Sequence, residues 1–233
     1  MGGPAGGGDD RDTAISGPAV VRAALRPWGA AHLRDFPWRR TTDPFLILLA
    51  ELMLRRTRAA QVAPVYAAFT TRYPDARSLA AADAGDVAGA LRPLGLTWRV
   101  PAFTAVARAL VADHGGAVPA SYAALAALPG VGDYVASAVC CFAYGQALPL
   151  VDTNTVRVAG RLVGRATHAG SRRHRWLREL LAELVDPEEP RAYHYALLDL
   201  AATICTPARP ACPRCPLRGS CAIGRNSVAA PPS

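Results

Sequence analysis

The C-terminal part of the sequence holds four cysteines within seventeen residues, at a spacing that suits a metal ion or an iron–sulfur cluster. They follow the pattern C-x6-C-x2-C-x5-C, at Cys205, Cys212, Cys215 and Cys221. Prolines between them stiffen the turns of this segment. In a cytoplasmic chain, four thiols gathered in this way indicate ligation rather than disulfides. Zinc and a [4Fe-4S] cluster both accept four cysteines, and the spacing alone does not decide between them.

A second stretch, LPGVGDY at Leu128–Tyr134, has the composition of a tight turn between two helices. Pro129, Gly130 and Gly132 interrupt an apolar helical pattern that resumes at Tyr134. Two glycines allow positive φ and a close approach of the backbone to a ligand. The N–H groups that open the second helix attract anions, and a DNA phosphate is the natural occupant. A plain turn between packed helices is the alternative.

Two acidic residues stand out by their positions. Asp152 directly precedes the helical run of VDTNTVRV, where aspartate is a common N-cap. Glu51 lies inside the apolar segment LILLAELMLRRT, where a carboxylate is unfavourable unless it is paired or functional. The alternative for Glu51 is an ion pair with Arg55 at i+4, which contributes roughly a few tenths of a kcal/mol when exposed.

Helical periodicity runs through most of the chain and alternating strand patterns are essentially absent, so we predict an all-α fold. Asp43 and Asp83 are expected to be N-caps, and Cys140 and Cys141 are expected to be buried thiols within a helix. Residues 1–17 read as a disordered tail and residues 34–44 as a loop. Helices are expected after Pro18 and over 44–58, 59–71, 78–81, 84–91, 98–113, a short segment opened by Ser121, 134–144, 154–163, 172–185 and 192–204.

Composition favours a polyanionic partner. The chain has 233 residues, a formal net charge of +8 and a pI near 9.6, although a high arginine content also follows from genome composition. All 26 basic residues are arginine, so the sequence contains no lysine. No run of about 18 apolar residues is free of charge and proline, and the N-terminus lacks a signal-peptide pattern. A cytoplasmic, nucleoid-associated protein is therefore expected.

The hairpin LPGVGDY, the segment VDTNTVRV and the cysteine tail together resemble the helix-hairpin-helix DNA glycosylases of the endonuclease III type. The three motifs come in the same order and at fitting intervals, and the resemblance covers nearly everything from Phe36 to Cys221. It implies a two-lobed fold: a six-helix barrel over 43–146, a cluster domain from 18–42 and 147–221, and a tail at 222–233. It also implies a [4Fe-4S] cluster rather than zinc, mismatched double-stranded DNA as partner, and a monomer.

Within that superfamily, FPWRRTTDPFLILLAELMLRRT resembles two branches: adenine glycosylases acting on A opposite G or oxidised G, and thymine glycosylases acting on G·T mismatches. Three features favour the thymine branch. Tyr134 stands where adenine glycosylases typically carry serine and bifunctional lyases carry lysine. The segment Leu54–Thr57, LRRT, looks like the thymine branch, whereas adenine glycosylases usually have paired glutamines there. Only twelve residues follow Cys221, which leaves no room for the domain with which adenine glycosylases inspect oxidised guanine.

The resemblance implies roles for individual residues. Asp152 takes the position of the catalytic aspartate, which stabilises an oxocarbenium-like sugar and positions a water. Glu51 takes the position of the base-protonating glutamate, and for thymine it would orient the base. Tyr134 would pack against the extruded nucleotide, its alternative being a core aromatic. DNA contacts are expected from Gly130, Val131, Gly132, Arg56, Arg209 and Arg214, although the arginines are also compatible with a solvated surface.

A monofunctional DNA N-glycosylase of base excision repair is therefore predicted, acting on thymine or uracil opposite guanine. Tyrosine at residue 134 cannot form the Schiff base that lyase activity needs, and no lysine is present to substitute for it. The first alternative is an adenine glycosylase. The second, from another class, is a non-catalytic, cluster-containing DNA-binding protein that shares the hairpin, although the presence of both Asp152 and Glu51 argues against it.

Overall fold

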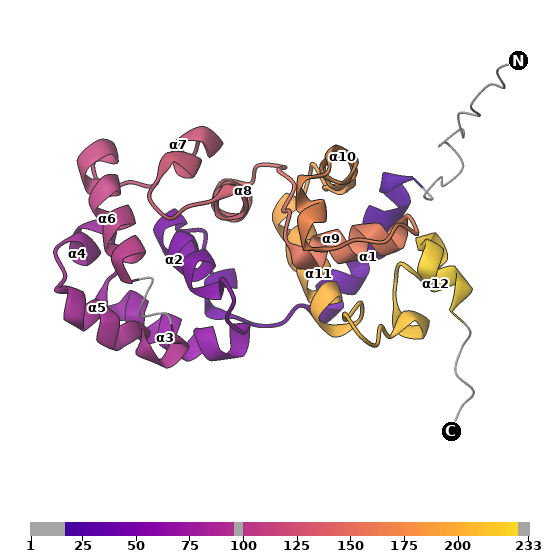
Figure 1. Ribbon diagram of the computed structural model, residues 1–233, viewed down its shortest axis with the longest axis horizontal. Coiled ribbons are helices and arrows are strands. Elements are labelled where there is room, and N and C mark those ends of the chain that lie inside the picture. The colour runs from indigo at the N-terminus through magenta and orange to yellow at the C-terminus, as the bar shows by residue number, and fades with distance from the viewer. Residues whose placement is uncertain (1–16, 96–99, 228–233) are drawn as a thin grey trace, which may run out of the picture. The chain divides into compact units, whose positions relative to one another are not determined.

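A computed structural model describes residues 17–95 and 100–227 of the chain (Figure 1). Every regular element in these residues is an α-helix or a short 3₁₀ turn, and they contain no strand. The predicted all-α class is confirmed. The disordered tail predicted for residues 1–17 falls almost wholly outside the described residues. So do the last six residues of the C-terminal tail, whereas Ala222–Asn226 of that tail forms helix α12.

The chain forms two compact units. The first consists of the segment ending at Leu33, Val151–Asp186 and the chain from Ala192 onward, and the second of Arg34–Leu150 with Pro187–Arg191. Residues 34–42, which the resemblance groups with the cluster domain, belong to the second unit. The barrel and the cluster domain themselves stay predictions.

The second unit is built around two apolar helices, α2 and α8, that pack side by side (Figure 1). Both are buried over most of their length, from Ile47 to Met53 in α2 and from Val135 to Phe142 in α8. Helices that are apolar on all sides belong in a core. The helices of this unit are α2 (Pro44–Leu54), α3 (Ala59–Arg72), α4 (Ala76–Ala80), α5 (Ala84–Leu91), α6 (Val100–His114), α7 (Tyr122–Ala127) and α8 (Asp133–Tyr144), with 3₁₀ turns η1 (Pro37–Arg39) and η2 (Arg92–Leu94).

The limits of α2 follow from local chemistry. Asp43 is its N-cap, because the Asp43 carboxylate accepts hydrogen bonds from the N–H groups of Phe45 at 2.8 Å and Leu46 at 3.1 Å. The helix ends at Leu54, four residues before the predicted Arg58. It ends there because Arg55 leaves the helical region and Arg56 has a φ of 62°. The predicted N-cap of α5, Asp83, is confirmed in the same way.

The first unit packs its helices around a separate apolar core. Buried side chains from α1, α9, α10 and α11 meet there, among them Leu25, Val156, Leu177 and Leu200. Its elements are α1 (Pro18–His32), α9 (Thr153–Leu162), η4 (Ala169–Arg173), α10 (Arg175–Leu184), α11 (Pro190–Thr203), η5 (Cys212–Arg214), η6 (Arg218–Ser220) and α12. Residues 172–174, predicted as the first turn of α10, precede it instead and largely belong to η4.

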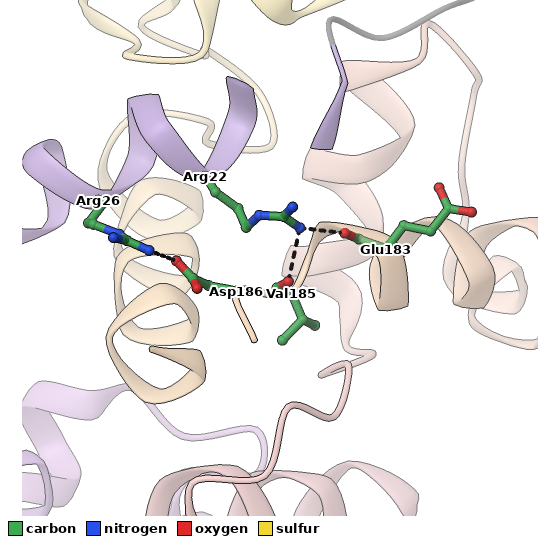
Figure 2. Close-up of polar contacts among 5 residues, drawn as sticks. All are labelled: Arg22, Arg26, Glu183, Val185 and Asp186. Atoms are coloured by element: carbon green, nitrogen blue, oxygen red, sulfur yellow. Dashed lines mark hydrogen bonds and ion pairs between the residues drawn. The ribbon is translucent and has the colours of Figure 1, made fainter. Parts of the chain in front are cut away.

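Two arginines of α1 hold the end of α10 (Figure 2). Arg22 Nη1 donates to the carbonyl oxygens of Glu183 at 2.8 Å and Val185 at 3.1 Å, which satisfies acceptors that a helix C-terminus leaves open (Figure 2). Arg26 Nη2 lies 2.6 Å from Asp186 Oδ2, and the Asp186 side chain is only 4% exposed (Figure 2). These contacts join segments that are about 160 residues apart and fix α1 in the first unit.

Candidate functional site

The predicted hairpin joins α7 to α8 in the second unit. Gly130 has a φ of +75°, and a Cβ added there would lie 3.0 Å from Ala102 Cβ, so glycine is required on both counts. The N–H of Val131 donates to the carbonyl oxygen of Leu128 at 3.1 Å and closes the turn. Gly132 is different, because its φ of −106° and ψ of 175° are extended. The expectation that both glycines use positive φ is therefore wrong for Gly132.

The start of α8 keeps the features of an anion site. Gly132 is the N-cap, is exposed, and supplies no side chain to cap the first-turn N–H groups of α8. A Cβ at Gly132 would meet no atom within 4 Å, so the space beside this residue is open. Val131 is only 7% exposed, so its expected DNA contact can come from the main chain alone.

Arg55 connects the end of α2 with this hairpin. Arg55 Nη1 donates to the carbonyl oxygen of Gly130 at 2.9 Å, so the turn that carries Gly130 is held by the helix that carries Glu51. Arg56, which is exposed, is the one non-glycine residue with positive φ in the described part of the chain. Left-handed backbone at a non-glycine residue costs roughly 1–2 kcal/mol, and such strain is concentrated at functional positions.

Glu51 is buried in α2, with a relative exposure of 4%. The thiol of Cys141 on α8 reports on its surroundings. Burial raises the pKa of Cys141 to about 12, the nearby Arg191 guanidinium lowers it and the Glu51 carboxylate raises it. Arg191 also donates to the main-chain oxygens of Arg39, at 2.9 Å, and Thr41. Arg191 and Glu51 therefore both lie close enough to Cys141 to act on its thiol.

Two aromatic residues of this unit, Tyr134 and Trp38, differ in how deeply they are buried. Tyr134 is half-buried in the first turn of α8, so it is neither a fully buried core aromatic nor fully exposed. Trp38 is buried, packs edge-on against Tyr66 with ring centroids 5.5 Å apart, and stacks on Phe36 at 4.9 Å. Trp38 thus anchors the loop before α2.

Asp152 begins α9 in the first unit and is its N-cap. Asp152 Oδ1 accepts from the N–H groups of Asn154 and Thr155, both at 2.8 Å, and Oδ2 accepts from Asn154 Nδ2 at 2.8 Å. Thr155 Oγ1 accepts in return from the Asp152 N–H at 3.0 Å, which completes a capping box. The carboxylate is half-buried rather than sealed in the core, and its oxygens retain lone pairs for a further donor.

A chain of hydrogen bonds runs from Asp152 to the cysteine segment. Asn154 Oδ1 accepts from Arg157 Nη1 and Nη2, both at 3.2 Å. Arg157 then donates from Nε to the carbonyl oxygen of Cys205 at 2.9 Å and from Nη2 to that of Ala201 at 2.8 Å. Burial lowers the pKa of Arg157, while neighbouring Cys205 and Asp152 counter the shift. The helix that Asp152 caps is therefore joined to the first cysteine of the motif.

The four cysteines are half-buried and belong to the first unit. The pKa of Cys215 is raised to about 11, mainly by burial and in smaller part by the other three thiols, while a hydrogen bond from the Leu217 main chain lowers it. N–H donors reach two of the sulfurs: Arg161 Nη1 lies 3.3 Å from Cys205 Sγ, and the Gly224 N–H lies 3.3 Å from Cys221 Sγ. Such donors stabilise thiolate ligands.

By the chemistry of their thiols, the four cysteines are the candidate ligands of a bound group. Across the residues that the structure describes, no three His, Cys, Asp or Glu side chains are gathered closely enough to hold a metal ion as they stand. Four half-buried thiols with N–H donors fit an iron–sulfur cluster by the chemistry of the ligands.

Several residues of this arrangement were missed by the sequence analysis. They are Asn154, Arg157, Arg161 and Arg191, which hold the site through hydrogen bonds rather than through a motif. One signal was available: Arg157 and Arg161 are four residues apart in the helix that starts at Asp152, so they share a face of that helix. Nothing in the sequence pointed to the contact of Arg191 with residues about 150 positions earlier.

Comparison with known proteins identifies the family. The family model of the HhH-GPD superfamily base excision DNA repair protein matches residues 49–186, more than half of the chain. The chain belongs to this superfamily. The residues that the family model matches include the hairpin, Glu51, Tyr134 and Asp152.

Three relatives of this chain are DNA glycosylases named for two kinds of substrate base. The thymine-DNA glycosylase of Aeropyrum pernix is 38% identical over 214 residues, 89% of this chain and 95% of that protein. The thymine/uracil-DNA glycosylase of Methanothermobacter thermautotrophicus is 36% identical, over 86% of this chain and 91% of that protein. An adenine DNA glycosylase of Mycobacterium tuberculosis is 37% identical, over 88% of this chain and 69% of that protein.

Solved structures agree on the fold of this HhH-GPD protein. The structure of a thermostable thymine-DNA glycosylase matches 90% of this chain and 97% of that one, with a TM-score of 0.84 and 33% identity. An endonuclease III in a trapped covalent complex with DNA matches with a TM-score of 0.72 at 23% identity, which shows the fold alone. The predicted resemblance is confirmed, and a DNA glycosylase of base excision repair is supported.

Among the described residues, no helix is both long and apolar enough to cross a membrane.

Proposed function

We propose that this protein is a monofunctional DNA N-glycosylase that removes thymine or uracil from opposite guanine in duplex DNA, acting as a monomer on the chromosome in the cytoplasm. The observation that carries the proposal is the Asp152 carboxylate, half-buried at the start of α9 and oriented by three N–H donors. Relatives named as thymine or thymine/uracil glycosylases, 38% and 36% identical, support the choice of base.

The proposed reaction breaks the bond between C1′ of the sugar and the base nitrogen. The bonding electrons leave with the base, and the sugar becomes oxocarbenium-like. Asp152 supplies the fixed negative charge that stabilises this cation, because its orientation by the capping box is set before the substrate arrives. Water then attacks C1′ and its proton passes to the departing base anion, which leaves the free base and an abasic site with both strands intact.

We propose that Glu51 and Tyr134 contact the extruded base. Thymine and uracil leave as anions that hydrogen bonds can stabilise, so Glu51 would orient the base rather than protonate it. Its burial in α2 makes this contact selective, since a buried carboxylate demands a matched partner. Tyr134, half-buried at the start of α8, offers a ring face for packing. A mispaired base costs less to extrude than a paired one, which favours mismatches.

DNA would be held by the hairpin and by exposed arginines. The Gly132 end of α8 presents main-chain N–H groups to a phosphate. Arg209 and Arg214 are exposed on the cysteine segment, where Thr206 Oγ1 donates to the carbonyl oxygen of Arg209 at 2.7 Å and stiffens the loop. Arg56, which is exposed and follows the Arg55 that contacts the hairpin, is proposed to occupy the space that the extruded base leaves.

The proposed cofactor is a [4Fe-4S] cluster held by Cys205, Cys212, Cys215 and Cys221. Bound there, the cluster would cross-link the segment that carries the two arginines and fix its shape. The four half-buried thiols and the N–H donors at two sulfurs support this assignment.

One rival function has specific support. The adenine DNA glycosylase of Mycobacterium tuberculosis is 37% identical to this chain, close to the values for the thymine enzymes, and Glu51 suits a base that must be protonated before it leaves. An adenine glycosylase acting on A opposite G is therefore the alternative. A DNA-binding protein without activity would be a third outcome.

A panel of duplexes tests the proposal. Labelled duplexes with a single G·T, G·U or A·G pair are incubated with protein, and each reaction is divided between alkali treatment and no treatment. We expect cleaved product from G·T and G·U after alkali only. Excision of A alone would establish the adenine function. Binding without excision from any duplex would leave a non-catalytic protein. An Asp152→Asn sample serves as the matched blank.

A further inference from the structure

Arg161, in the last turn of α9, spreads its guanidinium over the start of the cysteine segment. Nη1 donates to the carbonyl oxygen of Thr206 at 2.7 Å and Nη2 to that of Pro207 at 2.7 Å. Nη1 also lies 3.3 Å from Cys205 Sγ and 3.4 Å from the Cys205 carbonyl oxygen. One half-buried side chain thus contacts three consecutive residues, the first of which is a proposed ligand.

The main chain of the same residue contacts a second cysteine. Cys221 Sγ lies 3.2 Å from the carbonyl oxygen of Arg161. Just beyond, Gly164 turns with a φ of +70°, and a Cβ there would lie 3.2 Å from Ala222 Cβ. The end of α9 is therefore packed against both the first and the last cysteine of the motif. A substitution at Arg161 would change the surroundings of these two proposed ligands directly.

We propose that Arg161, without being a ligand, sets the reduction potential of the cluster and its retention by donating an N–H to the Cys205 sulfur. The inference rests on the proposed cofactor. Thiolate ligands place negative charge on the cluster, and a positive N–H donor at a ligand sulfur favours the more reduced, more negative state. The reduction potential is therefore higher with Arg161 in place than without it.

Arginine is suited to this task by its shape. Its planar fork carries several N–H groups in fixed directions, so it can contact Cys205 Sγ while it holds the carbonyl oxygens of Thr206 and Pro207. Lysine keeps the charge on a single nitrogen and cannot reach the same set of acceptors together. The role thus divides into a charge, which lysine preserves, and an oriented N–H donor to sulfur, which lysine loses.

The test compares wild-type protein with Arg161→Gln, Arg161→Lys and a matched control, Arg165→Gln. Arg165 is four residues further on, is also half-buried, and lies over the Trp176 ring at 5.1 Å. Full-length proteins are purified without oxygen, and iron, sulfide and visible absorption are measured. Midpoint potentials are then recorded by film voltammetry, and iron loss to a chelator is followed over time.

We expect the midpoint potential to be lower in Arg161→Gln than in wild type, with Arg161→Lys between them and Arg165→Gln equal to wild type. Iron loss should become roughly 10- to 100-fold faster in Arg161→Gln, the usual effect of removing an outer-shell partner. A purely structural role for Arg161 would change retention and leave the potential of the remaining cluster unmoved.

The inference is overturned if loaded Arg161→Gln has the wild-type potential. If Arg161→Gln does not bind a cluster, the midpoint potential of Arg161→Lys is used instead. A wild-type potential in Arg161→Lys would show that the oriented N–H donor does not set the potential, and would overturn the inference. Wild-type protein without iron and sulfide would refute the cofactor, and the inference with it. Base excision from G·T duplexes by wild type is scored separately, so failure of the proposed reaction is distinguishable from failure at Arg161.

Discussion

At residue 152 one carboxylate has a structural task and a proposed chemical one. Capping α9 requires an oxygen acceptor, which Asp152 Oδ1 provides to the N–H groups of Asn154 and Thr155. Stabilising a sugar cation requires a negative charge. Asparagine is as good an N-cap as aspartate but carries no charge, so substitution by asparagine separates the two tasks.

The first prediction is that Asp152→Asn loses turnover without losing the fold. Single-turnover excision should fall roughly 10²- to 10⁴-fold, the range for a positioned catalytic group. Binding to a G·T duplex and the free energy of unfolding should change little. Asp83→Asn, which alters the N-cap of α5 in the same way, should keep full activity. If binding and stability fell in parallel with activity, Asp152 would be a cap alone.

The second prediction concerns Arg56, whose backbone is strained by a positive φ and whose side chain is exposed. Arg56→Gly should raise the free energy of unfolding by about 0.5–1 kcal/mol, since glycine adopts a φ of 62° without steric cost. The same change should weaken duplex binding and lower the slope of log affinity against log salt by about 0.9, the contribution of one phosphate contact.

Arg58→Gly is the matched control for that experiment. Arg58 is also exposed and lies two residues away, but its φ is −71°, so glycine relieves no strain there. Denaturant unfolding and binding at several salt concentrations measure both effects. A stabilised Arg56→Gly protein that binds and excises like wild type would show that the strain at Arg56 serves no DNA contact.

At the scale of elements, the hairpin between α7 and α8 contains two glycines that differ in what they need. Gly130 has left-handed backbone and a neighbour, Ala102, only 3.0 Å from any added Cβ. Gly132 has ordinary extended backbone and open space around it. The fold accounts for the first glycine, whereas the open space at the second would suit the proposed phosphate, which approaches the backbone closely.

The third prediction follows from this contrast. Gly130→Ala should lower the free energy of unfolding by roughly 1–2 kcal/mol through the left-handed backbone alone. Gly132→Ala should lower the free energy of unfolding by at most about 1 kcal/mol, because alanine is a poorer N-cap than glycine. It should nevertheless weaken duplex binding at least as strongly as Gly130→Ala does. Unfolding and binding curves measure both. Wild-type binding by Gly132→Ala would mean that the hairpin is a plain turn.

Sequence patterns predicted the elements well where the cause is local. The N-caps Asp43, Asp83 and Asp152 were readable because a cap bonds only to N–H groups two or three residues ahead. The end of α2 was missed, because residues 55–58 contain no glycine or proline and helix would be the ordinary choice there. The contact of Arg55 with Gly130, 75 residues away, holds that turn instead.

The side chains that support the candidate site could not be predicted from the sequence, because they too act on residues far away along the chain. Arg157 and Arg161 contact Cys205 and its neighbours across more than 40 residues, and Arg191 reaches Arg39 across 152. Arginines of this kind look like solvated surface in a chain with 26 of them. The chemistry-bearing residues could be named in advance, but the residues that orient them follow only from the fold.

At the scale of the whole molecule, the absence of lysine limits the chemistry of the chain. A lyase forms a Schiff base, in which an uncharged primary amine attacks C1′ as the base departs, and the strand then breaks by elimination. Arginine cannot take this part, because its guanidinium stays protonated. Within this sequence the only primary amine is that of the N-terminus, so no lysine is present on which a Schiff base could form.

The last prediction is that the wild-type protein excises the base but leaves no covalent adduct and no strand break. Incubation of a G·T duplex with borohydride should trap nothing, and breaks should appear only after alkali. The control is Tyr134→Lys, which places an amine at the half-buried start of α8. That variant should give a trapped adduct if residue 134 lies beside the sugar. Breaks without alkali in wild type would contradict the monofunctional assignment, and a Tyr134→Lys protein that excises the base without trapping would remove residue 134 from the site.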